Sequence, residues 1–334
     1  MEWRDHSGGG CALGSTMIFG TASTGEDVQK LTLSAGDLTI SLLDWGAILQ
    51  DVRLAGVDRS LTFGSKDFAD YEGPKRFHGS LIGPIANRIS TSRVEIDGMM
   101  YELERNQDGR IHLHSGVQAT HLRIWEVVAQ SDHAATLRCT LMDGECGLPG
   151  NRIITATFTL TPPATLTLAI DATTDAATCM NFANHSYWNF DGSPTWEGHQ
   201  LWIDADHYLP TDADACPTGE IADVTGTDMD FRAPRRIKPG SPVLDHNFCV
   251  SGNQVPLSEV AKLTGQSGVG VKIATNQPGV QIYDGRDSVS NYGALAVECQ
   301  GWPDAPNHAG FPSINVTPAA PYHQITRFTF FKPG

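Results

Sequence analysis

Residues 152–171, RIITATFTLTPPATLTLAID, form two alternating runs around a pair of prolines. Apolar residues recur at every second position, at 154, 156, 158 and 160 before the prolines and at 166, 168 and 170 after them. Side chains two residues apart lie on the same face of a β-strand, and proline cannot donate to a strand ladder. The segment therefore predicts two half-buried antiparallel strands joined by a turn at Pro162-Pro163.

The same alternation continues on both sides of this hairpin. It recurs at positions 38, 40 and 42, at 269, 271 and 273, and at 328 and 330. Asp97-Gly98, which follows Ile96, predicts a tight hairpin because these residues tolerate the positive φ angles of a type I′ turn. Only short segments such as residues 65–71 are candidates for a helix. We therefore expect an all-β protein, a single large β-sandwich over residues 17–334, although periodicity alone leaves a barrel open.

The composition limits the classes of partner. The 334 residues include 23 Lys and Arg against 38 Asp and Glu, a formal net charge of −15. An acidic chain lacks the broad basic surface that binds phosphate backbones or anionic lipids, so we expect no nucleic-acid and no membrane partner. Charged residues make up 18% of the chain, against about 25% in typical proteins, which favours strands and loops over surface helices.

The cysteines and the N-terminal residues bear on location. Seven cysteines include no C-x-x-C pair, and their odd number leaves one unpaired in any monomeric scheme, which favours a reducing compartment. The first residues lack the basic and apolar regions of a signal peptide. We expect a cytoplasmic protein, monomeric or homodimeric. Residues 1–16 contain Gly8-Gly9-Gly10 without periodicity and are interpreted as a flexible leader or an expression remnant.

Four segments concentrate polar residues beyond what strand packing requires: 83–89, 111–116, 181–190, and 280–283 together with 295–308. Alternation places His185 and Tyr187 on one strand face and Trp188 on the other, and it turns Glu298 away from its apolar neighbours. A histidine and a carboxylate facing each other across a groove can act as general acid and general base, each worth about 10²–10⁴ in rate. Neither needs a metal for that work.

Six motifs, in order, resemble those of the aldose 1-epimerase (galactose mutarotase) family. They are ANRI (86–89), HLHSG (112–116), NHSYWNF (184–190), DHNF (245–248), VQIYDG (280–285) and VECQGWPDAPN (297–307). The resemblance extends over nearly the whole chain from about Ile18. It implies a large antiparallel β-sandwich of the galactose mutarotase type. It also implies an isomerase that interconverts the α and β anomers of a free aldose, with no metal or organic cofactor.

The resemblance also implies a role for each matched residue. Glu298 is the expected general base for the C1 hydroxyl, and His185 is the expected general acid for the ring oxygen. His114 is expected to hydrogen-bond near the ring oxygen and stabilise its developing charge. The sugar hydroxyls are assigned to Asn87, Arg88, Asp245 and Gln281. Trp302 is our own candidate for the aromatic ring that packs on the apolar face of the sugar.

Some positions depart from the family pattern, and they bear on sugar preference rather than on the reaction. Pro84 stands where many members have Arg, and Ser115 replaces the first Gly of L-H-G-G. His112-Leu113-His114 has the spacing of a metal site but lacks the carboxylate that should follow. His78 and His121, outside the motifs, are predicted to be ordinary surface or core side chains. Two alternatives stay open: a non-catalytic sugar-binding or regulatory protein on this scaffold, and a hexose-phosphate epimerase.

Overall fold

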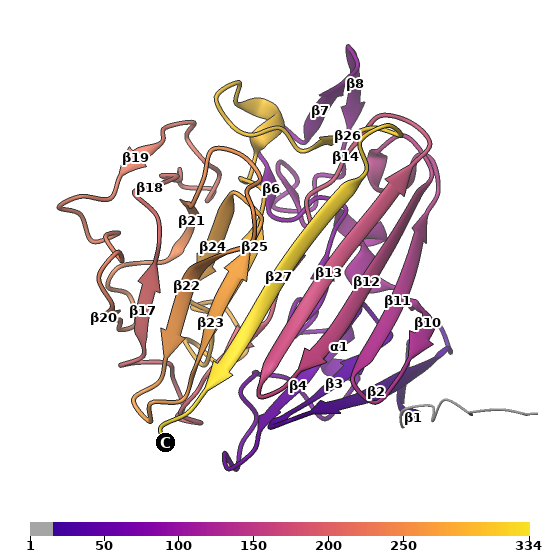
Figure 1. The fold of residues 1–334 in the computed structure, drawn as a ribbon. Helices are drawn as coiled ribbons and strands as arrows, with labels where there is room; N and C mark the ends of the chain where they lie inside the picture. Colours follow the sequence, from indigo (N-terminus) through magenta and orange to yellow (C-terminus); the bar gives the residue numbers. More distant parts are fainter. Residues whose placement is uncertain (1–15) are drawn as a thin grey trace, which may run out of the picture.

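The computed structural model describes residues 16–334, and antiparallel strands are their main regular structure (Figure 1). The all-β prediction is therefore confirmed. The leader predicted at residues 1–16 lies outside the described residues except for Thr16, which begins the first strand. The predicted hairpins form at both expected places. Strands β12 and β13 pair around Pro162-Pro163, and β7 and β8 turn at Asp97-Gly98, where φ is 49° and 76°.

The largest sheet has nine strands in the order β10-β11-β12-β13-β27-β23-β22-β17-β20. Its long central strands lie side by side across the front of the view in Figure 1. Their bounds are β10 Glu126–Gln130, β11 Ala134–Leu141, β12 Arg152–Thr161, β13 Thr165–Thr174, β27 Tyr322–Phe331, β23 Gly270–Thr275, β22 Ser258–Thr264, β17 Gln200–Ile203 and β20 Arg235–Arg236.

A second sheet of six strands, in the order β16-β25-β24-β21-β18-β19, supplies most of the polar motifs. Its bounds are β16 Tyr187–Trp188, β25 Leu295–Gln300, β24 Gly279–Tyr283, β21 Asp245–Cys249, β18 His207–Tyr208 and β19 Ala222–Asp223. A four-stranded sheet comprises β1 Thr16–Thr21, β2 Asp27–Ala35, β3 Leu38–Leu43 and β4 Ile48–Leu54.

Short strand pairs and helices complete the described chain. The pairs are β5 Leu81–Ile82 with β15 Ala183–Asn184, β6 Arg88–Ile89 with β9 His112–Leu113, β7 Arg93–Ile96 with β8 Met99–Glu102, and β14 Thr178–Cys179 with β26 Asn315–Val316. The 3₁₀ turns are Gly116–Gln118, Thr120–Leu122, Glu145–Gly147 and Ala305–Asn307. Of residues 65–71, the candidate helix, only 69–71 are helical, in α1, Ala69–Glu72. Asp67 accepts the Ala69 N–H in a turn that precedes α1.

One apolar core joins the three large sheets and leaves the opposite face of the six-stranded sheet free for polar groups. Val297, Ile282 and Phe248 point into this core. Trp188 is fully buried there against Phe328 of the nine-stranded sheet, with ring centroids 5.6 Å apart. A buried aromatic side chain removes roughly 150–250 Å² from water, worth about 4–6 kcal/mol at 25 cal/mol per Å². The core thus determines which face of each strand of the six-stranded sheet carries polar side chains.

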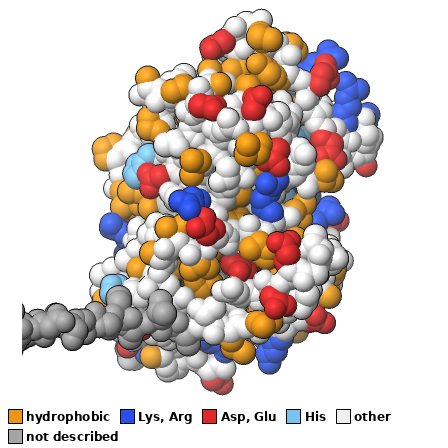
Figure 2. Space-filling model, turned by 90° about the vertical axis from the view of Figure 1, so that its right-hand side faces the viewer, with side chains coloured by type: hydrophobic (Ala, Val, Ile, Leu, Met, Phe, Trp, Pro, Cys, Tyr) orange, Lys and Arg blue, Asp and Glu red, His pale blue; other side chains and the backbone are white. Residues whose placement is uncertain are grey.

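The surface is mixed in character. On the face shown in Figure 2, acidic, basic and hydrophobic side chains are interspersed rather than gathered by type. None of the helices within residues 16–334 has the length and apolar character needed to cross a membrane.

Candidate active site

Strand register brings the polar motifs into one row across the six-stranded sheet. Glu298 on β25 pairs with Gln281 on β24, which pairs with Asn247 on β21. On the other side of β25, Tyr187 pairs with Ala296. Continuing that antiparallel register by two residues places His185 opposite Glu298. Residues more than a hundred positions apart therefore become cross-strand neighbours on the face that is turned away from the core.

His185 and Glu298 form a buried pair. His185 Nε2 lies 3.5 Å from Glu298 Oε1, and the two side chains are 5% and 2% exposed. Burial lowers the pKa of His185 to about 4. Burial, followed by the nearby charge of Asp245, raises the pKa of Glu298 well above its usual value. Both shifts favour the uncharged forms, a protonated Glu298 beside a neutral His185, and in that state the pair carries one proton. The predicted groups lie side by side rather than across a groove, because their strands are neighbours.

His114 is held in one tautomer by the backbone of Asn87. The backbone N–H of Asn87 donates to His114 Nδ1 at 3.0 Å. The backbone N–H of His114 donates to the Asn87 backbone carbonyl at 3.0 Å. Since Nδ1 accepts, the proton of the neutral imidazole resides on Nε2. Burial lowers the pKa of His114 well below its usual value and keeps the ring neutral. His114 can therefore donate one hydrogen bond from Nε2.

Ser115, one of the departures from the family pattern, links two loops by hydrogen bonds to the Ile85 backbone. Its hydroxyl accepts the Ile85 N–H at 2.7 Å and donates to the Ile85 carbonyl at 3.0 Å. The segments that carry Asn87 and His114 are thereby tied together. This substitution acts on the loops behind the cavity, since Ser115 is 1% exposed.

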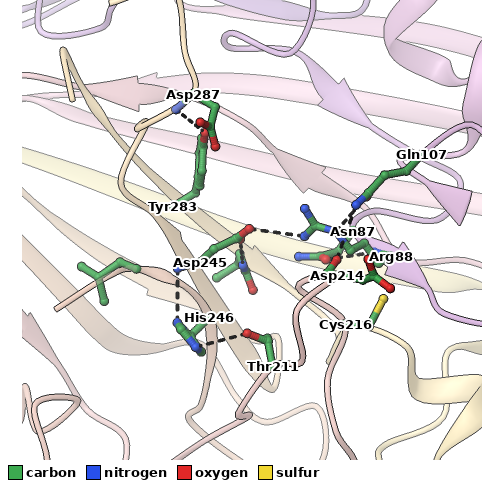
Figure 3. Close-up of polar contacts among 12 residues, drawn as sticks. Asn87, Arg88, Gln107, Thr211, Asp214, Cys216, Asp245, His246, Tyr283 and Asp287 are labelled. Carbon is green, nitrogen blue, oxygen red and sulfur yellow. Dashed lines mark hydrogen bonds and ion pairs between the residues drawn. The ribbon is translucent and has the colours of Figure 1, made fainter. Parts of the chain in front are cut away.

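Arg88 and Asp245, labelled in Figure 3, form a hydrogen-bonded group with Gln281 at the side of the cavity. Gln281 Nε2 donates to Asp245 Oδ1 at 2.7 Å, and Arg88 Nη1 donates to Asp245 Oδ2 at 3.4 Å. Arg88 Nε donates to Gln107 Oε1 at 2.9 Å, which fixes the guanidinium plane. Two donors aimed at Asp245 hold its carboxylate in place as an acceptor.

Replacing Asp245 with Asn should weaken substrate binding more than turnover. The amide would present a donor where Gln281 or Arg88 already donates, and the charge-assisted bond to a substrate hydroxyl would be lost. Hydrogen bonds to charged groups are worth about 1.5–3 kcal/mol, so we expect KM to rise about 10- to 100-fold, measured by initial rates over a substrate series. The matched control is Asp214→Asn, which alters an exposed pair with Arg110 and should leave KM unchanged. A wild-type KM for Asp245→Asn would contradict this role.

These side chains line one cavity of about 620 Å³, together with His185, Glu298, His114 and Asn87. The cavity also includes Tyr187, which alternation places on the His185 face, and two residues that the sequence did not indicate, Phe77 and His78. His78 stacks on Tyr187 with ring centroids 4.0 Å apart, and Tyr187 lies 5.0 Å from the His185 ring. Phe77 packs on the other side of His185. Residues 77–78 precede the first motif and show no alternation, so little in the sequence marks them.

Trp302 lies outside this cavity, and its predicted placement is wrong. Its ring packs edge-on against Phe311 at 5.1 Å, and its Nε1 donates to the Pro278 carbonyl at 2.9 Å. Strand β25 ends at Gln300 and the chain bends at Gly301. The alternation that points Glu298 into the cavity therefore stops before it reaches Trp302.

The H-x-H spacing does not produce a pair of parallel imidazoles. Strand β9 is two residues long, and His114 has φ of 52°, in the left-handed region. His112 turns instead toward the Glu104 carbonyl, which accepts from its Nδ1 at 2.7 Å. Within residues 16–334, no group of three or more His, Cys, Asp or Glu side chains is arranged to hold a metal ion.

One face of the six-stranded sheet thus carries a buried carboxyl–imidazole pair next to a row of hydrogen-bonding side chains. This arrangement defines a class of antiparallel sandwich protein with an acid–base site for a polar ligand. The sequence model described as aldose 1-epimerase matches residues 29–329. The chain belongs to the aldose 1-epimerase family.

Individual relatives agree with this assignment. The chain is 32% identical to galactose mutarotase from Homo sapiens, over 94% of this chain and 97% of that protein. It is 30% identical to aldose 1-epimerase from Escherichia coli K12, over 92% and 97%. The solved structure of an aldose epimerase homologue from C. elegans superposes with a TM-score of 0.84 at 27% identity, covering 91% of this chain and 99% of that one. These likenesses confirm the β-sandwich of the galactose mutarotase type.

Proposed function

We propose that this protein is an isomerase that interconverts the α and β anomers of a free aldose. The observation that carries the proposal is the buried His185–Glu298 pair, 3.5 Å apart in a cavity lined by hydroxyl-binding side chains. The C1 hydroxyl and the ring oxygen of a pyranose are bonded to the same carbon. Two neighbouring groups that share a proton can therefore serve both oxygens at once.

In the proposed reaction Glu298, as carboxylate, removes the proton from the C1 hydroxyl. The bond between C1 and the ring oxygen breaks, its electron pair goes to the ring oxygen, and His185 donates a proton there. Rotation about C1–C2 in the open-chain aldehyde presents its other face, and the same transfers in reverse close the ring. Since each proton returns to its starting group, the proposed cycle needs no metal and no organic cofactor.

The remaining groups would bind and orient the sugar. His114 would donate from Nε2 to the ring oxygen, where negative charge develops. Asn87, Arg88, Asp245 and Gln281 would hold hydroxyls. Among the aromatic side chains that line the cavity, Phe77 and Tyr283 are half-buried. They replace Trp302 as candidates for packing on the apolar face of the ring.

The test is anomer exchange in freshly dissolved α-D-glucose, α-D-galactose and a panel of pentoses and deoxysugars, followed by polarimetry or NMR. We expect at least one sugar to equilibrate faster than in buffer alone. Binding of a sugar by calorimetry with exchange at the buffer rate would instead identify a non-catalytic sugar-binding protein. No acceleration for any sugar would overturn the proposal.

A phosphorylated hexose is the weaker candidate substrate. Two arginines line the cavity, Arg76 and Arg88, but Arg88 is already paired with Asp245. Glu72, Asp287 and Glu298 add further acidic groups. This excess of carboxyl groups favours a neutral sugar over a dianionic phosphate. Hexose 6-phosphates belong in the same panel, and we expect slower exchange for them than for the free aldoses.

The remaining sequence predictions are part of the same proposal. They are a single domain over residues 17–334, a monomer or homodimer, a cytoplasmic location, and a free monosaccharide as the partner rather than nucleic acid. A net charge of −15 supports the exclusion of nucleic acid.

The pH dependence should follow the shared proton. In the active form of the pair, Glu298 is charged and His185 is protonated. In the neutral form, Glu298 holds the proton and His185 is uncharged. Both forms therefore carry one proton. Activity should therefore fall only when a second proton binds, below the pKa of His185 at about 4, or when the last proton leaves, above the raised pKa of Glu298.

We expect no acid limb of kcat/KM near pH 6.5, where an ordinary imidazole titrates, because the pKa of His185 is lowered to about 4. Exchange rates at each pH are corrected with the Glu298→Gln protein as a blank, because acid and base in the buffer also catalyse the reaction. A fall in kcat/KM on acidification with an apparent pKa near 6.5 would contradict this account of the pair.

A further inference from the structure

Asn181 joins three segments of the candidate site. Its side-chain Oδ1 accepts the Gly301 N–H at 2.7 Å, and its Nδ2 donates to the Gly301 carbonyl at 3.2 Å. Its backbone N–H donates to the Pro84 carbonyl at 2.6 Å, and its own carbonyl accepts the Ala86 N–H at 2.7 Å. Asn181 is 2% exposed. Every backbone and amide group of this residue is thus engaged with a segment distant in the sequence.

Each of those segments leads directly to a proposed catalytic or binding side chain. Asn181 lies four residues before His185, and Gly301 lies three residues after Glu298. Ala86 immediately precedes Asn87. The Asn181 side chain lies close to Gly301, since a Cβ added to Gly301 would lie only 3.1 Å from Asn181 Oδ1.

The catalytic pair itself lacks a backbone ladder. The ladder between β16 and β25 consists of the pairs Tyr187 with Ala296 and Trp188 with Leu295. The His185 N–H donates instead to the Ser80 carbonyl, and the His185 carbonyl accepts from Gly79. The distance between His185 and Glu298 therefore depends on the contacts that hold the two segments carrying them. Ser80 and Gly79 hold His185, and the pairing with β24 holds Glu298. The two segments are joined to each other by the β16–β25 ladder on one side and by the Asn181 amide on Gly301 on the other.

We propose that Asn181 is a positioning residue that sets the spacing of Glu298 and His185 by holding Gly301 with both atoms of its amide. The inference rests on the proposed function. Backbone bonds to Pro84 and Ala86 survive substitution, so the side chain acts selectively on the strand that carries Glu298. Misplacement by about 1 Å can cost about 100-fold in rate.

The first experiment compares Asn181→Ala with the wild type by anomer-exchange kinetics, per mole of folded protein. We expect kcat to fall about 10- to 100-fold while KM changes less than about threefold, because Asn87, Arg88 and Asp245 keep their contacts. The pH limits of kcat/KM should also move toward each other, since the two groups share a proton less well when farther apart.

A second variant, Asn181→Asp, keeps the shape and removes only the donor. As a carboxylate it would face the Gly301 carbonyl without a proton to donate, whereas the protonated acid restores both bonds. Its kcat relative to wild type should therefore rise as the pH falls. A merely structural role would not produce this recovery.

Asn189→Ala is the matched control. This buried amide belongs to the same polar segment, residues 181–190, and donates to the Ser193 and Gly293 carbonyls at 2.8 and 2.7 Å, but it does not touch Gly301. It should lower the Tm without changing kcat or the pH limits. If wild type is active and Asn181→Ala keeps wild-type kcat and pH limits, or if Asn189→Ala matches its kinetic loss, the positioning role is overturned. An inactive wild type would instead overturn the proposed function.

Discussion

Replacing Glu298 with Gln should reduce kcat/KM for anomer exchange by about 10²–10⁴-fold, the usual contribution of a general base. The amide fills the same space but cannot accept the proton of the C1 hydroxyl. The fold should not suffer, because burial already favours the uncharged form of Glu298 and Gln is uncharged at every pH. We therefore expect an unchanged or higher Tm together with the loss of activity, measured by polarimetry with calorimetry on the same preparation.

Sugar binding separates loss of chemistry from loss of the site. The variant should still bind its sugar within a few-fold of wild type by calorimetry, since Asn87, Arg88 and Asp245 remain. Glu259→Gln is the matched control, because Glu259 pairs with Lys272 at 3.4 Å on the exposed surface of the nine-stranded sheet. Near-wild-type exchange by Glu298→Gln would show that another group removes the proton.

Replacing His185 with Asn should cause a loss of similar size, about 10²–10⁴-fold in kcat/KM. The introduced amide could hold a hydrogen bond near the ring oxygen but could not deliver a proton as the C1 bond breaks. Because the two groups act on one proton cycle, the double variant with Glu298→Gln should be little worse than the poorer single variant. Additive losses would argue for two independent roles.

The control for this variant is His323→Asn, which removes an exposed imidazole paired with Asp171 at 2.7 Å. Its exchange rate should equal that of wild type. Retained turnover in His185→Asn would transfer the acid role to another donor, and His114, which can donate from Nε2, would be the first to test.

Much of the site followed from strand alternation. Because the side chains of β25 and β16 point to opposite faces in turn, the order of residues alone places Glu298 and Tyr187 on a polar face and Trp188 in the core. The structure agrees, with Trp188 fully buried among aromatic rings. Trp302 shows where this reasoning ends, since one bend at Gly301 invalidates the alternation two residues beyond the strand.

Other members of the cavity depend on contacts that no local pattern encodes. Arg88 and Asp245 are 157 positions apart and meet at 3.4 Å. Asn87 and His114 both adopt left-handed backbone angles, with φ of 66° and 52°, so no strand period predicts their directions. Phe77 and His78 enter the site only because their loop packs against the Tyr187 and His185 rings.

The sequence by itself determined the strands, the face of each strand that is buried, and the resemblance that names the candidate acid and base. Only the tertiary structure decided which of those faces meet, that Trp302 lies elsewhere, and that Asn181 spans the two catalytic segments. It also lowers the pKa of His185 and raises the pKa of Glu298. Alternation is a local property of one strand, whereas the pKa of Glu298 and of His185 depends on how completely other segments remove water from them.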